Sequence, residues 1–504
     1  MPDHRSAAEV YHQLTKYTRQ NIRGGGELDW SIQPATHKKI VSQQRIPLRP
    51  HHGPFATGES ADGTAFGLAH LARLLLHTGG VTGMLQTPGG SQGLRAAPSA
   101  GALYPVETYV AVREIPELDP GLYNFQVEPH QLVPMWPGDQ MEDLAQACFE
   151  IPAFQKARAC VLFTGIFWRS AWRYKERGYR RVLLDAGHLI GNLCSYAPLE
   201  SCSAMPVLGF VDEAVNNLFF LDATVEPVLA CLPILEEVTE CVPEPLFRSA
   251  TTLVEANLEP SEIRTHDDVP GSASVALHNA GCCLWDAAAT TSDDAVPDDA
   301  GETKLPFDGD IDVRLSHAIL RRRSARQYTG ETIALRQLGN VLGYTFGRGD
   351  DLGSGRPVRF ATREAGLMRA FLVAHGVDDL EPGVHEILGE GETLRTITAG
   401  QFSEEVCEMA LGQDIARACA AVLVLIAPAA EAVERYGDRA YRYLHLEAGH
   451  IGQRWQIAAQ AAELGACGIG GFLDDDVARF CGYPTDDWVL YLITLGRSQS
   501  ASRP

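Results

Sequence analysis

Residues 185–188 read Asp-Ala-Gly-His, and residues 447–450 read Glu-Ala-Gly-His. The same spacing of 262 residues separates Gly-Phe-Val-Asp at 209–212 from Gly-Phe-Leu-Asp at 471–474. Farther upstream, a second set of matches is spaced 267 residues apart: Leu68, Leu71, Leu75, Thr78 and Gly80 with Leu335, Leu338, Leu342, Thr345 and Gly347. Insertions and deletions in loops make the spacing of a repeat drift in this way. The sequence therefore predicts a duplicated domain.

Size and charge are consistent with two globular domains. The chain has 504 residues, of which 45% are hydrophobic, and each half can bury a substantial core. The net charge of −22 argues against nonspecific nucleic-acid binding, because such binding requires cationic groups that neutralise phosphates. A local basic pocket for a single phosphate group is still compatible with this charge.

We expect no signal peptide, membrane span, disulfide framework or metal site. Residues 1–20 are polar and charged and lack the apolar region of a signal peptide. No uninterrupted apolar run of about 18 residues suggests a transmembrane helix. The twelve cysteines include no C-x-x-C pair, and most lie in apolar segments, which is typical of buried reduced thiols. The predicted location is the cytoplasm.

Changes in composition divide the chain into four parts. Residues 1–60 form a polar N-terminal lead-in, and residues 61–250 form the first domain. Residues 251–308 contain clusters of Asp, Pro, Gly, Ser and Thr that bury little apolar surface, which predicts a linker or excursion. Within it, the short piece 276–285 has enough apolar residues to pack onto a domain. Residues 309–504 form the second domain.

Each half mixes helices and strands without strict alternation. Helical spacing of apolar residues predicts helices at 65–78, 181–197, 312–320, 334–344 and 441–464. Apolar runs predict strands at 108–113, 160–167, within 219–234, and at 371–374, 420–426 and 488–495. We therefore predict an α+β architecture, with helices layered on a mostly antiparallel or mixed sheet.

A basic cluster in the second half follows a predicted helix. Residues 322–326 read Arg-Arg-Ser-Ala-Arg. In an extended segment Arg322, Ser324 and Arg326 project from one side, because side chains alternate with a period of two. Two guanidinium groups and a hydroxyl suit a phosphate. The alternative is a solvated basic helix end, which the helix dipole favours.

Three other segments offer contacts to a ligand. Residues 468–472 read Gly-Ile-Gly-Gly-Phe, and glycines let backbone N–H groups approach a ligand, although a simple turn would use the same residues. Arg497 follows the final predicted strand, where an arginine is usually a surface residue. In the first half, residues 95–105 form a loop of small residues and prolines that can lie flat against a planar ring. The alternative for this loop is a structural turn.

Residues 98–105 resemble a loop of the nitroreductase-fold flavoproteins, in particular the SagB-type dehydrogenases, which include azoline oxidases. Residues 11–16, 28–30 and 121–125 are also similar to that subfamily. Arg-x-Ser-x-Arg, the glycine pair at 470–471 and the terminal Gly-Arg are similar to the general nitroreductase pattern. The resemblance implies two tandem nitroreductase-like domains that form an intramolecular pseudo-dimer.

The resemblance further implies an FMN between the two domains, with its phosphate held by one domain and its ring contacted by the other. By this comparison the second half supplies Arg322, Ser324, Arg326, Gln413, Gly470, Gly471 and Arg497. The first half supplies Arg95, Pro98, Ser99 and Gly101. The match at Gln413 is weaker than the others.

The complementary pocket lacks these elements. Residues 45–54 contain no Arg-x-Ser-x-Arg, residues 359–369 contain no Pro-Ser loop, and no arginine follows the strand predicted within 219–234. Two glycines are also replaced: Gly468 by Pro206 and Gly470 by Leu208. Random drift would scatter such losses between the two sites. The pattern therefore predicts one FMN per chain.

Oxidation of a substrate by a flavin requires hydride transfer and a group that takes a proton. The resemblance implies a Lys-Tyr pair for the proton, but this chain has Arg173-Tyr174 in the first half and Arg435-Tyr436 in the second. An arginine cannot act as a base at ordinary pH, although it can lower the pKa of a neighbouring tyrosine. All four residues are catalytic candidates, and pairing of the arginines with nearby acidic residues is the alternative.

These features favour an FMN-dependent oxidoreductase that oxidises a peptide-derived or heterocyclic biosynthetic substrate, with oxygen as a candidate acceptor. An NAD(P)H-dependent nitro- or quinone reductase is the first alternative. A flavin-free pseudoenzyme that docks a peptide or another partner is the second, since one site has degenerated. The sequence identifies neither the substrate nor the electron acceptor, and it leaves a further homodimer open.

Overall fold

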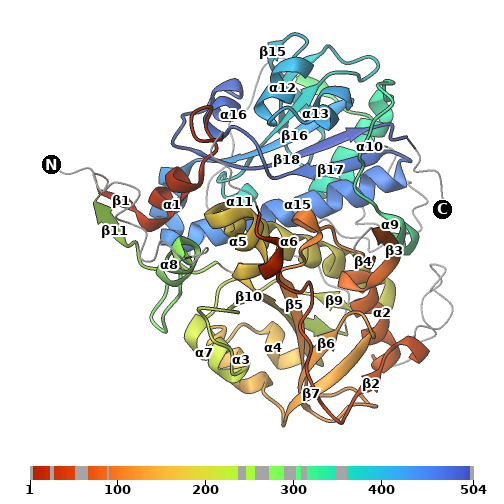
Figure 1. Ribbon diagram of the computed structural model, residues 1–504, viewed down its shortest axis with the longest axis vertical. Coiled ribbons are helices and arrows are strands. Elements are labelled where there is room, and N and C mark those ends of the chain that lie inside the picture. The colour runs from red at the N-terminus through yellow and green to blue at the C-terminus, as the bar shows by residue number, and fades with distance from the viewer. Residues whose placement is uncertain are drawn as a thin grey trace.

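The computed structural model describes residues 4–22, 28–51, 66–87, 90–236, 246–255, 272–288, 302–307, 315–347 and 360–499. Much of the predicted linker lies outside the described residues. So do residues 52–54 and 359, which belong to the two segments that lack the cofactor-binding motifs. Figure 1 shows the first half, in red to yellow, below the second half, in green to blue, with the long helices α6 and α15 between them.

Each half contains one seven-stranded sheet, and the two sheets share a strand order: β2-β7-β6-β5-β8-β10-β9 and β12-β15-β14-β13-β16-β18-β17. Their described ladders are antiparallel. The first sheet has β2 (Ile46–Pro47), β5 (Val106–Val112), β6 (Gly121–Gln126), β7 (Gln131–Pro137), β8 (Ala159–Gly165), β9 (Ser203–Ala204) and β10 (Val228–Leu235). The second has β12 (Glu302–Lys304), β13 (Arg369–Ala374), β14 (Gly383–Leu388), β15 (Thr393–Ala399), β16 (Ala421–Ala427), β17 (Gly465–Ile469) and β18 (Trp488–Gly496).

Two small sheets and the short helices complete the connections. The small sheets pair β1 (His4–Ser6) with β11 (Leu253–Glu255) and β3 (Val81–Thr87) with β4 (Gly90–Arg95). The connecting helices are α1 (Ala7–Thr15), η2 (Trp30–Ile32), η3 (Arg49–His51), η4 (Ala100–Ala102), α5 (Phe167–Tyr174), η5 (Lys175–Arg177), η6 (Ala197–Glu200), α8 (Ser272–Ala280), α9 (Leu315–Arg321), α11 (Ala361–Glu364), α14 (Ala429–Tyr436) and η7 (Gly437–Arg439). The predicted tandem α+β fold is confirmed.

Helices cover both faces of each sheet. The outer cores contain α3 (Met141–Ala147), α4 (Ala153–Lys156) and α7 (Asp212–Leu218) in the first half, and α12 (Ser403–Met409), α13 (Asp414–Ala418) and α16 (Asp474–Phe480) in the second. The central core, shared by both halves, contains α2 (Leu68–Gly79), α6 (Gly178–Tyr196), α10 (Leu335–Phe346) and α15 (Ala440–Ala461). Because both faces are covered, β8 and β16 are buried along their whole length. Within the described ranges, no helix is long and apolar enough to cross a bilayer.

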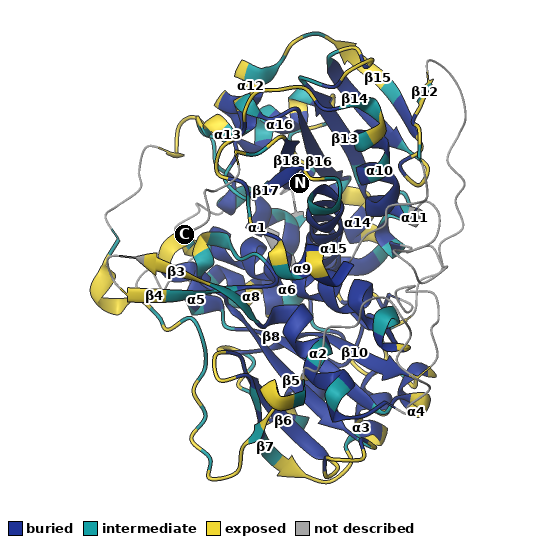
Figure 2. Ribbon diagram, turned by 90° about the vertical axis from the view of Figure 1, so that its right-hand side faces the viewer, coloured by how far each residue is buried: buried dark blue, intermediate teal, exposed yellow. Residues whose placement is uncertain are grey.

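The long helices α6 and α15 join the halves by touching backbone to backbone. Figure 2 shows these helices deep inside the protein, where almost every one of their residues is buried. A Cβ on Gly187 would lie 2.1 Å from the carbonyl oxygen of Leu446, and a Cβ on Gly449 would lie 2.2 Å from that of Leu184. The two contacts are equivalent in the repeat. The glycine of the repeated motif therefore marks a pseudo-twofold axis at which no larger residue fits.

A buried ion cluster lies beside this crossing. Asp474, at the start of α16, accepts hydrogen bonds from Arg177 at 2.7 Å and from Arg180 at 2.6 Å. All three side chains are almost completely buried. The carboxylate comes from the second half, whereas both arginines come from the first. The cluster therefore fixes one half against the other.

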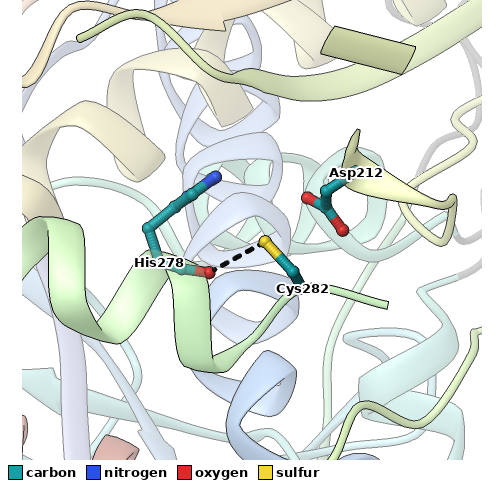
Figure 3. Close-up of side chains that lie close together, drawn as sticks. All are labelled: Asp212, His278 and Cys282. Atoms are coloured by element: carbon teal, nitrogen blue, oxygen red, sulfur yellow. Dashed lines mark hydrogen bonds between the residues drawn. The ribbon is translucent and has the colours of Figure 1, made fainter. Parts of the chain in front are cut away.

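Figure 3 shows the equivalent cluster on the other side, where Asp212, His278 and Cys282 lie close together. The two carboxylate oxygens of Asp212 bind the guanidinium groups of Arg439 and Arg442. Burial raises the pKa of Asp212, but the two arginines outweigh burial and bring it to about 2. Burial also raises the pKa of Cys282 to about 11, so this thiol stays protonated. Both carboxylate oxygens of Asp212 are therefore occupied by guanidinium groups, and the group is a buried ion cluster.

The helical segment that precedes each domain, α1 for the first and α8 for the second, contacts the opposite half. The N–H group of Tyr17, which follows α1, donates to Asp474 of the second half at 2.9 Å. The N–H group of Cys283, which follows α8, donates to Asp212 of the first half, also at 2.9 Å. The duplication therefore includes the lead-in. Residues 251–308, predicted as a linker, contain the packed helix α8.

Replacing Gly187 or Gly449 by alanine tests the helix crossing. Alanine normally stabilises a helix by about 1 kcal/mol relative to glycine. Here the added Cβ collides with backbone, so we expect a loss of at least roughly 1–3 kcal/mol in the free energy of unfolding, measured by denaturant titration. Gly376→Ala is the control, because its Cβ would have no neighbour closer than 3.6 Å. Equal stability of all three variants would contradict the crossing.

Candidate functional site

A pocket of about 410 Å³ lies between the two halves. Its first-half wall comes from the loop before β5, the end of α5 and α6. Its second-half wall comes from the segment after α9, from β17 and the glycines that follow it, and from Gln413, Gln456 and Tyr491. The structure brings to this pocket the predicted residues Pro98, Ser99, Gly101, Arg173, Tyr174, Ser324, Arg326, Gln413, Gly470 and Gly471.

The pocket is cationic although the protein is strongly acidic. Its lining includes Arg173, Arg181 and Arg326, against one carboxylate, Asp185. Two buried nitrogen atoms in the lining, Nη1 of Arg181 and Nε2 of Gln456, have no hydrogen-bond partner among the described residues. Local positive charge and unused donors favour an anionic ligand with several acceptor atoms.

The loop at residues 98–105 is fastened to α6 through Asp185. The Ser99 hydroxyl donates to the Asp185 carboxylate at 2.5 Å, and the Ala100 N–H group donates to it at 3.3 Å. The N–H group of Tyr104 in turn donates to the Ser99 hydroxyl at 2.9 Å. Burial raises the pKa of Asp185 to about 7, although the bond from Ser99 opposes this rise. The position of the loop therefore depends on a group that titrates near neutral pH.

Tyr174 closes the pocket against this loop. Gly101 has a φ of 63°, which favours glycine, and a Cβ there would lie 2.6 Å from the Tyr174 hydroxyl oxygen. The guanidinium carbon of Arg181 lies 3.6 Å from the centre of the tyrosine ring, and that of Arg173 lies 5.7 Å away. Burial raises the pKa of Tyr174, and both arginines oppose the rise. The hydroxyl therefore stays protonated at neutral pH.

The second half contributes a hydroxyl, a cation and glycine backbone. Ser324 forms a β-bridge with Ala466 of β17, which places it in the wall. Arg326 is exposed and makes no hydrogen bond or ion pair with any described residue, so its guanidinium group is available to a ligand. The amide nitrogen of Gln413 donates to the carbonyl of Gly471 at 3.1 Å. That bond fixes the backbone of the glycine segment.

Arg322 does not line the pocket but lies behind the second-half residues that do. Its Nε donates to the carbonyl of Ala96 at 2.9 Å, and its Nη1 donates to Gln456 at 3.2 Å and Ser324 at 3.4 Å. Burial lowers the pKa of Arg322 to about 10. The side chain connects the start of the first-half loop to two lining residues of the second half. Its predicted contact with a phosphate stays a prediction.

Arg95 and Arg497 lie outside the pocket lining. Arg95 is buried beneath the loop, where it stacks at 4.3 Å on the ring of Tyr104 and donates to the carbonyl of Thr36 at 2.7 Å. Arg497 is exposed after β18 and donates to the carbonyl of Thr332 at 2.9 Å. Arg95 supports the loop, and the predicted contacts of Arg95 and Arg497 with the cofactor stay predictions.

The second Arg-Tyr pair does not reach the pocket. Tyr436 is buried at the end of α14, where its carbonyl accepts a hydrogen bond from the N–H group of Ser249 at 3.1 Å. Arg435 donates to the carbonyl of Ala365 at 3.4 Å. Of the two candidate pairs, the structure places only the first-half pair among the pocket residues.

Protein fills the place equivalent to the pocket on the other side of the pseudo-twofold axis. Phe247 packs there against Gly209 and Tyr443, the counterparts of Gly471 and Arg181. A Cβ on Gly209 would lie 2.6 Å from the Phe247 ring, and the Tyr443 hydroxyl donates to the Phe247 carbonyl at 2.9 Å. The second site is therefore blocked by a ring and a backbone segment.

Sequence reasoning missed several pocket residues: Arg181, Asp185, Gln456, Cys467 and Tyr491. Arg181 and Asp185 are four residues apart, which places both on one face of α6. A signal was present for Arg181, because its counterpart in the second half is Tyr443. His188, which also lines the pocket, hydrogen-bonds Gln453 at 2.9 Å and Tyr491 at 3.0 Å, and burial lowers its pKa to about 3. The neutral His188 connects the two halves.

An Asp185→Asn variant tests the titrating loop contact. Folding raises the carboxyl pKa from 3.8 to about 7, so the folded protein binds an extra proton between these values. That contribution to stability is present at low pH and is lost as the pH rises through about 7. We expect the Tm of the native protein minus that of the variant to fall between about pH 5 and pH 8. A difference that stays constant across this range would contradict the assignment.

Comparison with known proteins agrees with this architecture. The sequence pattern of the Nitroreductase family matches residues 68–234 and 319–497. A crystal structure from Anabaena variabilis, of a protein described as a nitroreductase, is similar with a TM-score of 0.85 and 33% identity, covering 98% of this chain and 100% of that one. MJ1384 of Methanocaldococcus jannaschii, named as a nitroreductase, is 28% identical over 201 residues, which are 40% of this chain and 98% of MJ1384.

A further relative is the trifolitoxin-processing protein TfxB of Rhizobium leguminosarum bv. trifolii. It is 28% identical over 141 residues, which are 27% of this chain and 38% of TfxB. The match to TfxB is thus local, whereas the family pattern covers most of both halves. The chain belongs to the nitroreductase family and is an oxidoreductase-type protein built from two tandem nitroreductase domains.

Proposed function

We propose that this protein is an FMN-dependent oxidoreductase that holds one FMN per chain and oxidises a peptide-derived or heterocyclic biosynthetic substrate. The observation that carries the proposal is the asymmetry between the two equivalent positions. One is a cationic pocket of about 410 Å³, and the other is filled by Phe247. The similarity to a trifolitoxin-processing protein supports the substrate class.

The chemistry of the pocket suits FMN. Its volume lies in the usual range for small-molecule sites, about 300–1,000 Å³. Ser324 and Arg326 offer a hydroxyl and a guanidinium group for the phosphate, and the loop of small residues offers a flat wall for a planar ring. When bound, FMN would supply hydride acceptance. The fit rests on the unused donor of Gln456 and on the guanidinium group of Arg326, which bonds to no described residue.

Tyr174 is the residue best suited to move a proton. Its hydroxyl lies in the pocket wall next to Gly101, and its raised pKa keeps the hydroxyl protonated at neutral pH. Arg181 and Arg173 favour the ionised form, which reduces the cost of releasing the proton. Neither arginine can act as a base, so their role is electrostatic.

An NAD(P)H-dependent nitro- or quinone reductase is the second candidate. The similarity to MJ1384, which covers 98% of that protein, favours it. Addition of NADPH under anaerobic conditions separates the two functions. Rapid bleaching of the flavin absorbance supports the reductase, whereas a flavin that NADPH leaves oxidised supports substrate oxidation.

The flavin-to-chain ratio and an Arg326→Ala variant test the cofactor site. We expect one FMN per chain in the absorption spectrum of pure protein. Loss of a charge-assisted contact to the phosphate should weaken FMN binding by roughly 10- to 100-fold. Arg158→Ala is the control, since this arginine binds Glu114 and Glu236 outside the pocket. Arg322→Ala is a less clean test, because it also removes the bond to Ala96.

Two flavins per chain would contradict the blocked second position. A colourless preparation that does not bind added FMN would refute the proposed function and favour a flavin-free docking protein. Unchanged FMN affinity in Arg326→Ala would show that the phosphate lies elsewhere.

A matched pair of tyrosine variants tests proton transfer. Tyr174→Phe should lower the rate of substrate-dependent flavin reduction by about 100-fold, because a proton-transfer group is lost. Tyr436→Phe, which alters the equivalent residue outside the pocket, should change the rate by less than about twofold. The measurement is stopped-flow absorbance with azoline-containing peptides. Equal rates in both variants would remove Tyr174 from the mechanism.

A further inference from the structure

Arg181 is a buried cation that the fold leaves incompletely bonded. It lies in the first turn of α6, is 6% exposed and lines the interdomain pocket. Its Nη2 makes one long hydrogen bond, at 3.4 Å, to the carbonyl of Gly470, and its Nη1 has no hydrogen-bond partner in the described ranges. A guanidinium group carries five N–H donors, and a buried charge is normally paired. The guanidinium group of Arg181 therefore has N–H donors that a ligand in the pocket can use.

Arg181 interacts electrostatically with Asp185 but is not paired with it. Within the part of the chain that the structure describes, no carboxylate forms an ion pair with Arg181. Asp185, one turn later on the same helix, accepts hydrogen bonds from Ser99 and Ala100. Arg177 and Arg180, which precede Arg181, both bind Asp474. Arg181 is the one of these three arginines that faces the pocket.

The two halves carry different residues at this position, and the difference corresponds to whether the site on that side is open or filled by protein. The counterpart of Arg181 is Tyr443, whose hydroxyl is satisfied by the backbone of Phe247. The neutral residue occurs where protein fills the site, and the cation occurs where the site is open. Arg181 is thus not required by the helix or by the contact between halves. The charge occurs on the side where the pocket is open.

Arg181 reaches the pocket from the first half, next to Tyr174, whereas the predicted phosphate residues Ser324 and Arg326 reach it from the second half. It stacks on Tyr174, and its Nε would lie 3.3 Å from a Cβ on Gly470. Ser324 and Arg326 belong instead to the segment that follows α9. A group bound by Arg181 therefore lies beside the tyrosine hydroxyl.

We propose that Arg181 binds a carboxylate group of the substrate, so that the substrate of this pocket is a carboxylate-bearing compound. The inference rests on the proposed function and names its substrate class. Guanidinium and carboxylate groups pair through two parallel hydrogen bonds, which fixes orientation as well as position. Pairing also neutralises a charge that is otherwise buried. The bound substrate is thereby held next to Tyr174.

Benzoate and benzamide are suitable probes, because they share size and shape and differ in charge. Calorimetric titration of the flavin-containing protein should show benzoate binding at least about tenfold tighter than benzamide. Arg181→Gln should abolish this preference. Arg181→Lys, which keeps the charge but loses bidentate geometry, should retain only part of it. Arg158→Gln, outside the pocket, should bind both probes like the native protein.

Each failure has a separate meaning. Equal binding of the two probes by flavin-containing native protein would overturn the inference and leave the proposed function standing. Loss of flavin from Arg181→Gln would also overturn it, since the guanidinium group would then serve the cofactor. If Arg181→Gln does not fold, Arg181→Lys decides, and an undiminished benzoate preference overturns the inference. Native protein without flavin would instead refute the proposed function, which the visible spectrum reports independently of calorimetry.

Discussion

The direct contact between the backbones of α6 and α15 sets the position of everything else in the pocket. Gly187 and Gly449 lack the side chains that would separate the helices. Each helix can therefore present residues to a space between the domains: Arg181 and Asp185 from α6, and Gln456 from α15. Domains held apart by ordinary side chains would leave these groups too distant to share one ligand.

The arginines at the start of α6 serve two places, the contact between the domains and the lining of the pocket. Arg177 and Arg180 bind Asp474 of the other half and so contribute to the contact between the domains. The next residue, Arg181, points to the pocket and has unused donors. One short stretch of chain thus supplies two cations to the contact between the domains and a third to the pocket. The division explains how an acidic protein maintains a cationic pocket at a buried interface.

The fold could be predicted from the sequence because the repeat and its periodicity are local patterns. Much of the pocket could also be predicted, since its loops carry recognisable small and basic residues. The burial of Arg322 could not, because it depends on a carbonyl at Ala96, more than two hundred residues away. The choice between the tyrosine pairs depends on Phe247, which lies outside the repeated motifs. The replacement of Arg181 by Tyr443 in the second half was a signal in the sequence, but its meaning depends on the neighbours of both residues in space.

The blocked second position has an evolutionary consequence. In a dimer of identical chains, a single codon specifies both copies of a position, so a change that closes one active site closes its partner. Fusion into one chain gives each copy its own codon. Tyr443 and Phe247 can then fill one side while the other side, lined in part by Arg181, stays open. Selection is free to tune the remaining cavity for a substrate without symmetry, because no second cavity has to change with it.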